Sequence, residues 1–140
     1  MSLTINQDVF PLAQVFTISR GSRTEAKVLS VKISRDRVSG WGECVPYARY
    51  NETAASVSAQ IESLPEAFDR QGLYELLPRG AARNAVDCAL WDLEAKQSGL
   101  RVWQLAGLPT PGPEITAYTL SLDSPENMRA QAAEHAHRPL

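Results

Sequence analysis

The chain has 140 residues, 44% of them hydrophobic, which is enough for one globular core but well short of the roughly 250 residues of a complete eight-fold βα barrel. Its 14 Lys and Arg are outnumbered by 16 Asp and Glu, so there is no basic surplus for binding nucleic acid or an anionic membrane. No stretch approaches 18 consecutive apolar residues and no leader-like pattern opens the chain, which predicts a soluble, cytoplasmic protein.

The first third of the chain has the pattern of three short strands. β-Branched and apolar residues recur over residues 15–18 and again over residues 25–33. The polar run 34–37 predicts a turn, and residues 38–45 predict a third strand that two glycines bend or bring close to a neighbour. Consecutive strands with brief connections favour an antiparallel meander.

Helices are expected after the strands. Asn51 is a suitable N-cap for a helix that runs to about Pro65. The signal is stronger between Gly80 and Gly99, where apolar residues share one stripe at helical spacing. The stripe consists of Ala82, Ala85, Val86, Ala89, Leu90 and Leu93. A short helical turn over residues 102–106 follows.

A proline-rich linker then divides the chain. Residues 110–113, Thr-Pro-Gly-Pro, predict a connection without regular structure. Beyond it, residues 115–122 predict a strand, and residues 124–135, which open with Ser-Pro, predict a helix. A strand, loop and helix in this position indicate the first βα unit of a second domain. The expected domains are therefore 1–109 and 110–140.

Two polar connections carry side chains that can bind an anion. The first, residues 20–24, includes Arg23, and a guanidinium can hold a carboxylate through two parallel hydrogen bonds. The second, residues 46–51, follows the third strand. Its aromatic and cationic residues are Tyr47, Arg49 and Tyr50. From the residues alone, a solvated hairpin loop and a loop whose aromatics pack on a neighbouring helix stay open as plainer interpretations.

The sequence contains no recognisable catalytic constellation. Cys44 and Cys88 predict buried free thiols rather than a disulfide or a zinc site. Asp87 and Asp92 would point about 140° apart around a helix, so they do not form a carboxylate pair. The three tryptophans predict anchors of the core or of a domain interface. Up to this point a non-catalytic α+β binding module fits as well as an enzyme.

Three motifs carry a family resemblance. They are ARNAVDCALWDLEAK at residues 82–96, GWGE at 40–43 and RGSRTEA at 20–26. Together they resemble the mandelate racemase and muconate lactonizing enzyme group of the enolase superfamily, and within it the dipeptide epimerases of the L-Ala-D/L-Glu type. The resemblance implies an α+β capping domain, a three-stranded antiparallel meander followed by helices. Residues 110–140 would then be the linker and first βα unit of a (β/α)7β barrel.

The resemblance also implies an activity. Such an enzyme is an isomerase that removes the proton α to a substrate carboxylate with the help of Mg²⁺ and returns a proton to the other face. By resemblance, Arg23 binds a substrate carboxylate, and Thr119 lines the substrate pocket. A second specificity loop would hold Tyr47, Arg49 and Tyr50. The family's two lysines and three acidic metal ligands have no counterpart here, so no catalytic or metal-binding residue, and no activity of the chain alone, is expected.

Two rival functions stay open beside the dipeptide epimerase. A muconate cycloisomerase or an o-succinylbenzoate synthase of the same group would share the proton abstraction but not the peptide substrate, and Arg23 argues against it. A binding module is disfavoured because a lone βα unit would expose its apolar strand. The resemblance further implies a dipeptide from cell-wall peptide recycling as substrate and the protein's own barrel domain as partner. A homo-oligomer stays open.

Overall fold

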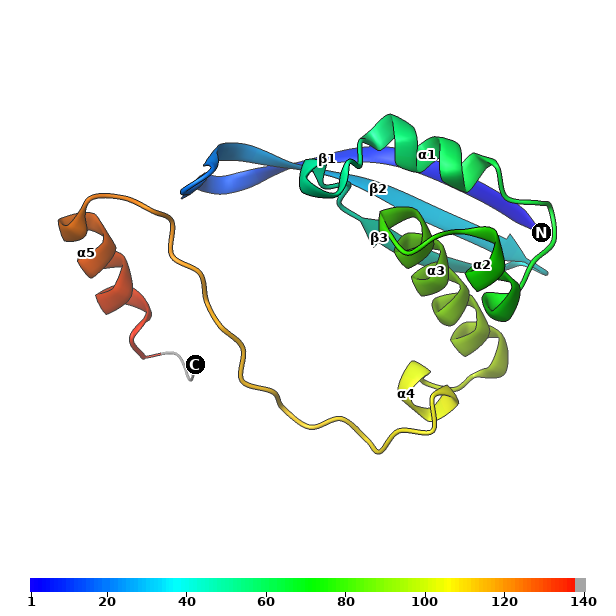
Figure 1. Ribbon diagram of the computed structural model, residues 1–140. Coiled ribbons are helices and arrows are strands. Elements are labelled where there is room, and N and C mark those ends of the chain that lie inside the picture. Colours follow the sequence, from blue (N-terminus) through cyan, green and yellow to red (C-terminus); the bar gives the residue numbers. More distant parts are fainter. Residues whose placement is uncertain (138–140) are drawn as a thin grey trace. The chain divides into compact units, whose positions relative to one another are not determined.

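The computed structural model describes residues 1–137. By their contacts these residues form two units: Met1–Val9 with Lys27–Thr110, and Phe10–Ala26 with the chain from Pro111 onward. Both units contain part of one hairpin, because its two strands run through both of them. Figure 1 shows the elements in chain order.

Three strands form a single sheet in the order β1-β2-β3. They are β1 (Ser2–Ile18), β2 (Gly21–Arg35) and β3 (Val38–Cys44). β2 pairs antiparallel with β3, and the turn between them places Asp36 and Arg37 at φ 50° and 68°, as the tight turns of two-residue hairpins require. The predicted meander and the predicted turn are confirmed.

The first two strands are longer than the sequence predicts. β1 reaches back to Ser2 through Pro11, which is tolerated because β1 is an edge strand of the sheet. Only Ser19 and Arg20 form the turn to β2, so Arg23 lies within a strand. The expected five-residue loop is wrong, because a two-residue connection suits the twist of paired strands.

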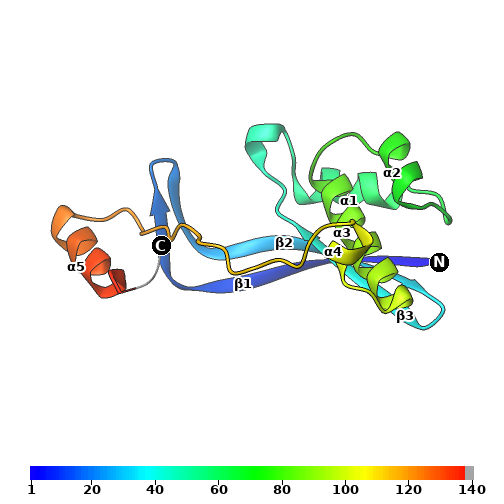
Figure 2. The ribbon, with the colours of Figure 1, turned by 90° about the horizontal axis from the view of Figure 1, so that it is seen from below.

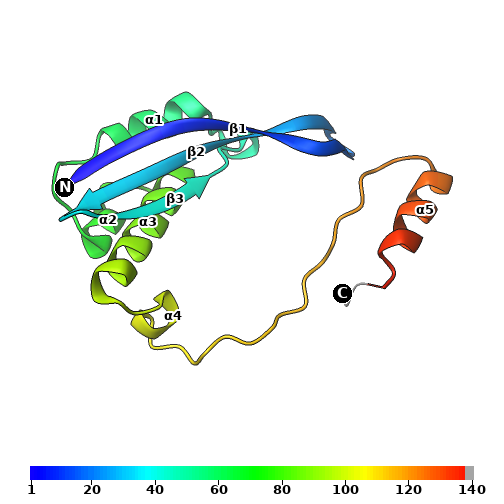
Figure 3. The ribbon, with the colours of Figure 1, turned by 180° about the vertical axis from the view of Figure 1, so that it is seen from behind.

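The helices of the first unit follow the sheet. They are the 3-10 turn η1 (Ala48–Tyr50), α1 (Ala54–Glu62), α2 (Arg70–Leu76), α3 (Ala81–Ser98) and α4 (Val102–Leu105). α1, α2 and α3 lie on one face of the sheet, as Figures 2 and 3 show from below and from behind. The strong helix that the sequence predicts is α3, and it ends at Gly99 in the left-handed conformation, as expected.

The start predicted for the first helix is wrong. Asn51 instead ends η1 with φ 58°, and α1 is capped by Thr53, whose hydroxyl accepts a hydrogen bond from Ser56 N at 3.0 Å. The Ser56 hydroxyl in turn accepts a hydrogen bond from Thr53 N at 3.0 Å, so the two residues cap the helix reciprocally. The sequence also missed α2, in which Leu73 is the one buried residue and Asp69 supplies the N-cap.

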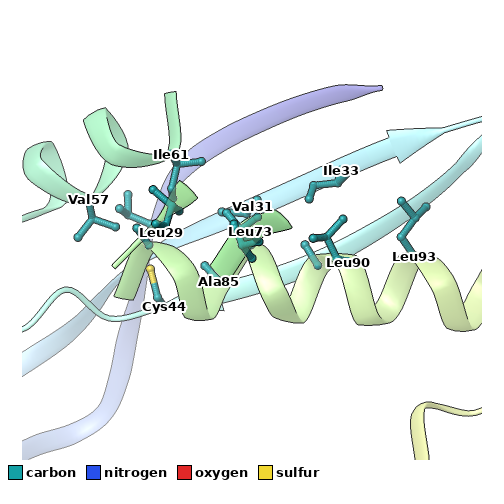
Figure 4. Packing of buried hydrophobic residues seen from close by; sticks show 14 residues of the cluster. Leu29, Val31, Ile33, Cys44, Val57, Ile61, Leu73, Ala85, Leu90 and Leu93 are labelled. Atoms are coloured by element: carbon teal, nitrogen blue, oxygen red, sulfur yellow. The ribbon is translucent and has the colours of Figure 1, made fainter. Parts of the chain in front are cut away.

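The core of the first unit lies between α3 and the sheet (Figure 4). All six stripe residues predicted for α3 are at most 2% exposed. Gly40 and Gly42 of β3 allow this packing, since an added Cβ would lie 2.0 Å from Ala89 O or 1.9 Å from Ala85 O. The other buried members are Leu29, Val31, Ile33, Cys44, Val57, Ile61, Leu73 and Leu77.

In the residues described, the second unit consists of the hairpin tip, an irregular segment and one helix. The helix is α5 (Pro125–His135), with Ser124 as N-cap and Pro125 in the first turn, as predicted. The strand expected over residues 115–122 is not formed, which corrects the prediction. A strand needs a neighbour along its whole length. Here a backbone bond from Leu122 N to Thr17 O, at 2.9 Å, ties only one end of the segment to β1.

The two cysteines differ in their surroundings. Both are free, but Cys44 is buried and Cys88 is exposed, because position 88 lies off the buried stripe of α3. The prediction of two buried thiols therefore holds for Cys44 alone. Burial, together with Glu52 and Glu43, raises the pKa of the Cys44 thiol to about 11. In the part of the chain described, no helix is long and apolar enough to cross a membrane.

Candidate functional site

Arg23 lies on β2 close to the hairpin tip, and its side chain is exposed. The hydroxyls of Thr17 and Ser22 are hydrogen-bonded across the hairpin at 2.8 Å, so these two side chains share one face. Strand alternation then places the Arg23 side chain on the opposite face. Within residues 1–137 the Arg23 guanidinium makes no ion pair or hydrogen bond, which leaves its donors available to an anionic ligand.

Thr119 belongs to the same unit and is exposed. Its segment is held on both sides. The ring of Tyr118 packs edge-on against His135 of α5, with ring centroids 4.5 Å apart. Two residues beyond Thr119, Ser121 is 8% exposed and hydrogen-bonded to β1. Thr119 therefore stands between two anchored residues although its segment has no regular secondary structure.

Tyr47, Arg49 and Tyr50 form the tyrosine loop around η1 in the other unit. Tyr50 N donates to Tyr47 O at 2.8 Å, and the two tyrosine rings lie 5.8 Å apart at 57°. Tyr47 is half-buried, whereas Tyr50 is 70% exposed and Arg49 is exposed too. The loop is thus a compact turn that presents one cation and one aromatic ring to solvent.

Glu52 holds this loop in place, although it was not among the site residues predicted from the sequence. Its Oε1 accepts from Ala81 N, the first residue of α3, at 2.7 Å, and its Oε2 accepts from Tyr47 N at 3.3 Å. The N-cap of α3 is Gly80, which has no side chain to cap the helix. A Cβ at Gly80 would lie 2.8 Å from Glu52 Oε1, so glycine makes room for the carboxylate.

A signal for Glu52 was present in the sequence. The strongest predicted helix begins after a glycine, so its first N–H groups needed an acceptor from elsewhere in the chain. A carboxylate is the group that a helix N-terminus favours most, because it also complements the helix dipole. What the sequence does not provide is which of several acidic residues lies there.

The predicted site residues are therefore divided between the units. Arg23 and Thr119 belong to one, and the tyrosine loop to the other. Among residues 1–137 no group of three or more His, Cys, Asp or Glu side chains could hold a metal ion. Asp92 serves the scaffold, since it accepts from Trp41 N at 2.8 Å and pairs with Lys96 at 2.6 Å.

Comparison with known proteins assigns the fold to a family. Residues 1–107 match the N-terminal domain of the mandelate racemase and muconate lactonizing enzyme family. The chain belongs to this family. The three-stranded sheet followed by helices is the capping domain that the resemblance implied, so that fold prediction is confirmed.

Similar proteins of this family are epimerases and racemases. The chain is 42% identical over 136 residues to the L-Ala-D/L-Glu epimerase of Escherichia coli K12, covering 94% of this chain and 42% of the relative. It is 43% identical over 108 residues to an N-acetyl-D-glutamate racemase of a Pseudoalteromonas species, covering 73% and 34%. The chain thus spans less than half the length of either enzyme.

A solved structure of the family has a higher identity to this chain than these two enzymes. It is an enolase family member from Agrobacterium tumefaciens with homology to dipeptide epimerases, and it holds sodium, L-Ala-L-Glu and an ordered loop. Its TM-score with this chain is 0.91 at 48% identity, covering 98% of this chain and 43% of the solved one. Other solved dipeptide epimerases contain magnesium together with a dipeptide.

Proposed function

We propose that this chain is the N-terminal part of a dipeptide epimerase of the L-Ala-D/L-Glu type. In this proposal residues 1–109 form the capping domain, and residues 110–140 form the linker and the start of the barrel. The observation that carries it is the similarity along almost the whole chain to an L-Ala-D/L-Glu epimerase and to a protein solved with L-Ala-L-Glu. The proposal includes a cytoplasmic location, which is an expectation from the sequence pattern, and a substrate from cell-wall peptide recycling, which rests on the resemblance.

The residues of this chain would bind and orient the substrate. Arg23 has an unpaired, exposed guanidinium, which suits the carboxylate of a Glu-containing dipeptide. Thr119 offers a hydroxyl between two anchored positions. The tyrosine loop adds the Arg49 cation and the exposed ring of Tyr50. Such contacts lower the entropy cost of reaching the reactive geometry, while proton transfer would be performed by other residues of the enzyme.

Mg²⁺ belongs to the proposal, but the residues described here do not form its site. When bound, such an ion stabilises negative charge on a substrate carboxylate. The metal ligands and the two lysines of the family would lie in the barrel, the domain partner of this chain in the full-length enzyme.

Isotope exchange tests the function. The full-length enzyme is incubated with L-Ala-L-Glu and Mg²⁺ in D₂O, and the α-proton of the Glu residue is followed by NMR while epimer formation is followed by chromatography. We expect deuterium at that carbon and a mixture of L-Ala-L-Glu and L-Ala-D-Glu. Absence of exchange with every dipeptide offered would favour a muconate cycloisomerase or an o-succinylbenzoate synthase instead.

A second candidate is a racemase of N-acylated glutamate, which the similarity to an N-acetyl-D-glutamate racemase favours. Both substrates carry the glutamate carboxylates that an arginine can hold, so they differ mainly in the group on the glutamate nitrogen. The same exchange experiment with N-acetyl-D-glutamate separates them. The dipeptide proposal predicts a larger kcat/KM for L-Ala-L-Glu, and the reverse ranking would overturn it.

A further inference from the structure

Ser121 is the buried polar residue of the described chain, at 8% exposed, in a segment whose other residues are mostly exposed. Its hydroxyl acts both as a donor and as an acceptor. It accepts a hydrogen bond from Thr17 N at 2.9 Å and donates one to Val15 O at 3.1 Å. Next to it, Leu122 N donates to Thr17 O at 2.9 Å. These bonds satisfy backbone groups at the edge of β1 that an adjacent strand would otherwise satisfy.

The same hydroxyl is linked to both candidate substrate-binding residues of its unit. Thr17, which donates to Ser121, is bonded through its side chain to Ser22 at 2.8 Å, and Ser22 directly precedes Arg23. In the other direction, Thr119 lies two residues before Ser121. A short series of hydrogen bonds therefore connects the hairpin that carries Arg23 to the segment that carries Thr119.

We infer that Ser121 is a positioning residue that fixes the Arg23 hairpin for substrate binding. The inference rests on the proposed function and names no contact between Ser121 and substrate. A guanidinium binds a carboxylate well only when both hydrogen bonds are aligned, and a hairpin tip without an edge partner must be ordered each time a ligand binds. With its bonds to Ser121, the hairpin tip is already ordered before the substrate binds.

If Ser121 has this role, its loss should change KM and not kcat. Loss of the Ser121 hydroxyl frees the hairpin, so it weakens binding of the substrate in the ground state and the transition state alike. Such a change raises KM and leaves kcat nearly unchanged. A residue that only supports the fold would lower the amount of active enzyme, which lowers the apparent kcat and leaves KM unchanged.

The test compares Ser121→Ala with Ser30→Ala in the full-length enzyme. Ser30 is a matched control, because its hydroxyl also makes a long-range bond, to Asp8 Oδ2 at 2.6 Å, but within the other unit. For Ser121→Ala we expect the KM for L-Ala-L-Glu to rise about tenfold and kcat to stay within about twofold. Ser30→Ala should leave both constants within about twofold of those of the unchanged enzyme.

A double variant shows whether Ser121 acts through Arg23. In an Arg23→Ala background, Ser121→Ala should change kcat/KM by less than about twofold, because the side chain that it positions is gone. An equal loss in both backgrounds, or an unchanged KM in the single variant, would overturn the inference. Where Ser121→Ala does not fold, Ser121→Cys keeps the size with a weaker donor, and the same KM criterion applies to it.

Amide hydrogen exchange distinguishes failure of this inference from failure of the proposed function. In Ser121→Ala the amide of Thr17 loses its acceptor, so its exchange should accelerate at least about tenfold, whereas Ser30→Ala should leave it unchanged. If the Thr17 amide exchanges faster in Ser121→Ala but the enzyme acts on neither substrate, Ser121 does hold the hairpin and the proposed activity is wrong. If this exchange is unchanged while the enzyme epimerises L-Ala-L-Glu, the role given to Ser121 is wrong.

Discussion

The Arg23 hairpin and the tyrosine loop differ in what holds them. The hairpin is tied to the later segment by the neutral hydroxyl of Ser121, which is 104 residues away from its partner Thr17, beside a backbone bond from Leu122 N. The loop is fixed by the Glu52 carboxylate, which bonds to residues 5 and 29 positions away. The hydroxyl must donate and accept at once, whereas the carboxylate only accepts and is helped by a helix dipole. The hairpin and the loop are both proposed to bind substrate, but different substitutions should disturb them.

The largest effect should be a loss of stability when the packing of β3 against α3 is disturbed. Gly42→Ala would place a Cβ 1.9 Å from Ala85 O, a backbone atom of α3 that cannot move alone. We expect a loss of at least about 3 kcal/mol in the free energy of unfolding, measured by urea titration. Gly112→Ala is the control, because nothing lies within 4 Å of its added Cβ. Equal stability of the two variants would contradict the close packing of β3 and α3.

Arg23→Ala should have the next largest effect, on binding at the hairpin. Removal of a charged pair of donors should lower kcat/KM for L-Ala-L-Glu by about 100-fold, with Arg23→Lys in between because it keeps the charge without the fork. Arg20→Ala, in the turn beside it, is the control. If Arg20→Ala is the more damaging change, the wrong arginine has been assigned to the carboxylate.

Glu52→Ala tests the carboxylate that holds the tyrosine loop. The change removes the cap of α3 and the acceptor of Tyr47 N, so we expect a loss of about 1–2 kcal/mol in unfolding free energy and a several-fold rise in KM. Glu52→Gln keeps one acceptor oxygen and should show roughly half of each effect.

Asp69→Ala provides the matched control for Glu52→Ala. Asp69 caps α2 by accepting from Gly72 N at 2.7 Å, and it has no bond to the tyrosine loop. Its loss should cost a similar amount of stability with no change in KM. A KM that rises equally in both variants would mean that general loosening, rather than the loop, sets substrate affinity.

The smallest effect should appear in cysteine reactivity. At pH 8 iodoacetamide should modify the exposed Cys88 first and leave Cys44 protected, because Cys44 is buried and its pKa is raised to about 11. Mass spectrometry of peptides reports both sites. Since Glu52 is among the causes of the raised pKa of Cys44, Glu52→Ala should speed the modification of Cys44. An unchanged rate would show that burial and Glu43 protect this thiol without a contribution from Glu52.

The buried thiol also gives the stability a pH dependence. Its folded pKa, about 11, lies above the ordinary value of 9.0, so the folded state binds the proton more tightly. The stabilisation is fully present below pH 9 and is lost as pH rises toward 11. In urea titrations, the free energy of unfolding should therefore fall more between pH 8 and pH 10.5 in the unchanged protein than in Cys44→Ala.

The sequence predicted the elements whose signal is local. The apolar stripe of α3, the turn at Asp36 and Arg37 and the Ser124 cap of α5 each depend on residues within a few positions, and each is confirmed. Helix α2 was not predicted, because it buries a single residue, Leu73, and so has no apolar stripe. The strand expected over 115–122 fails for a different reason, since alternation predicts a strand but does not supply its neighbour.

The candidate site shows the same division. Residue types and family resemblance led to Arg23, Thr119 and the tyrosine loop, and their roles stay predictions. The anchors were not foreseen. Ser121 is an ordinary serine in the sequence, and only contacts made across more than 100 residues show that its hydroxyl is buried. Glu52 was foreseeable in kind, as an acceptor for the N-terminus of α3, but not in position.

The division of one hairpin between two units has a practical consequence for dissecting the protein. A cut after residue 109 would follow the proline-rich linker, yet it would take Ser121 and Leu122 away from residues 15–17 of β1. The severed piece would keep its packed helices and carry a frayed edge with unsatisfied amide and carbonyl groups, the kind of edge on which chains aggregate. Fragments meant for biophysical work are therefore better cut beyond α5.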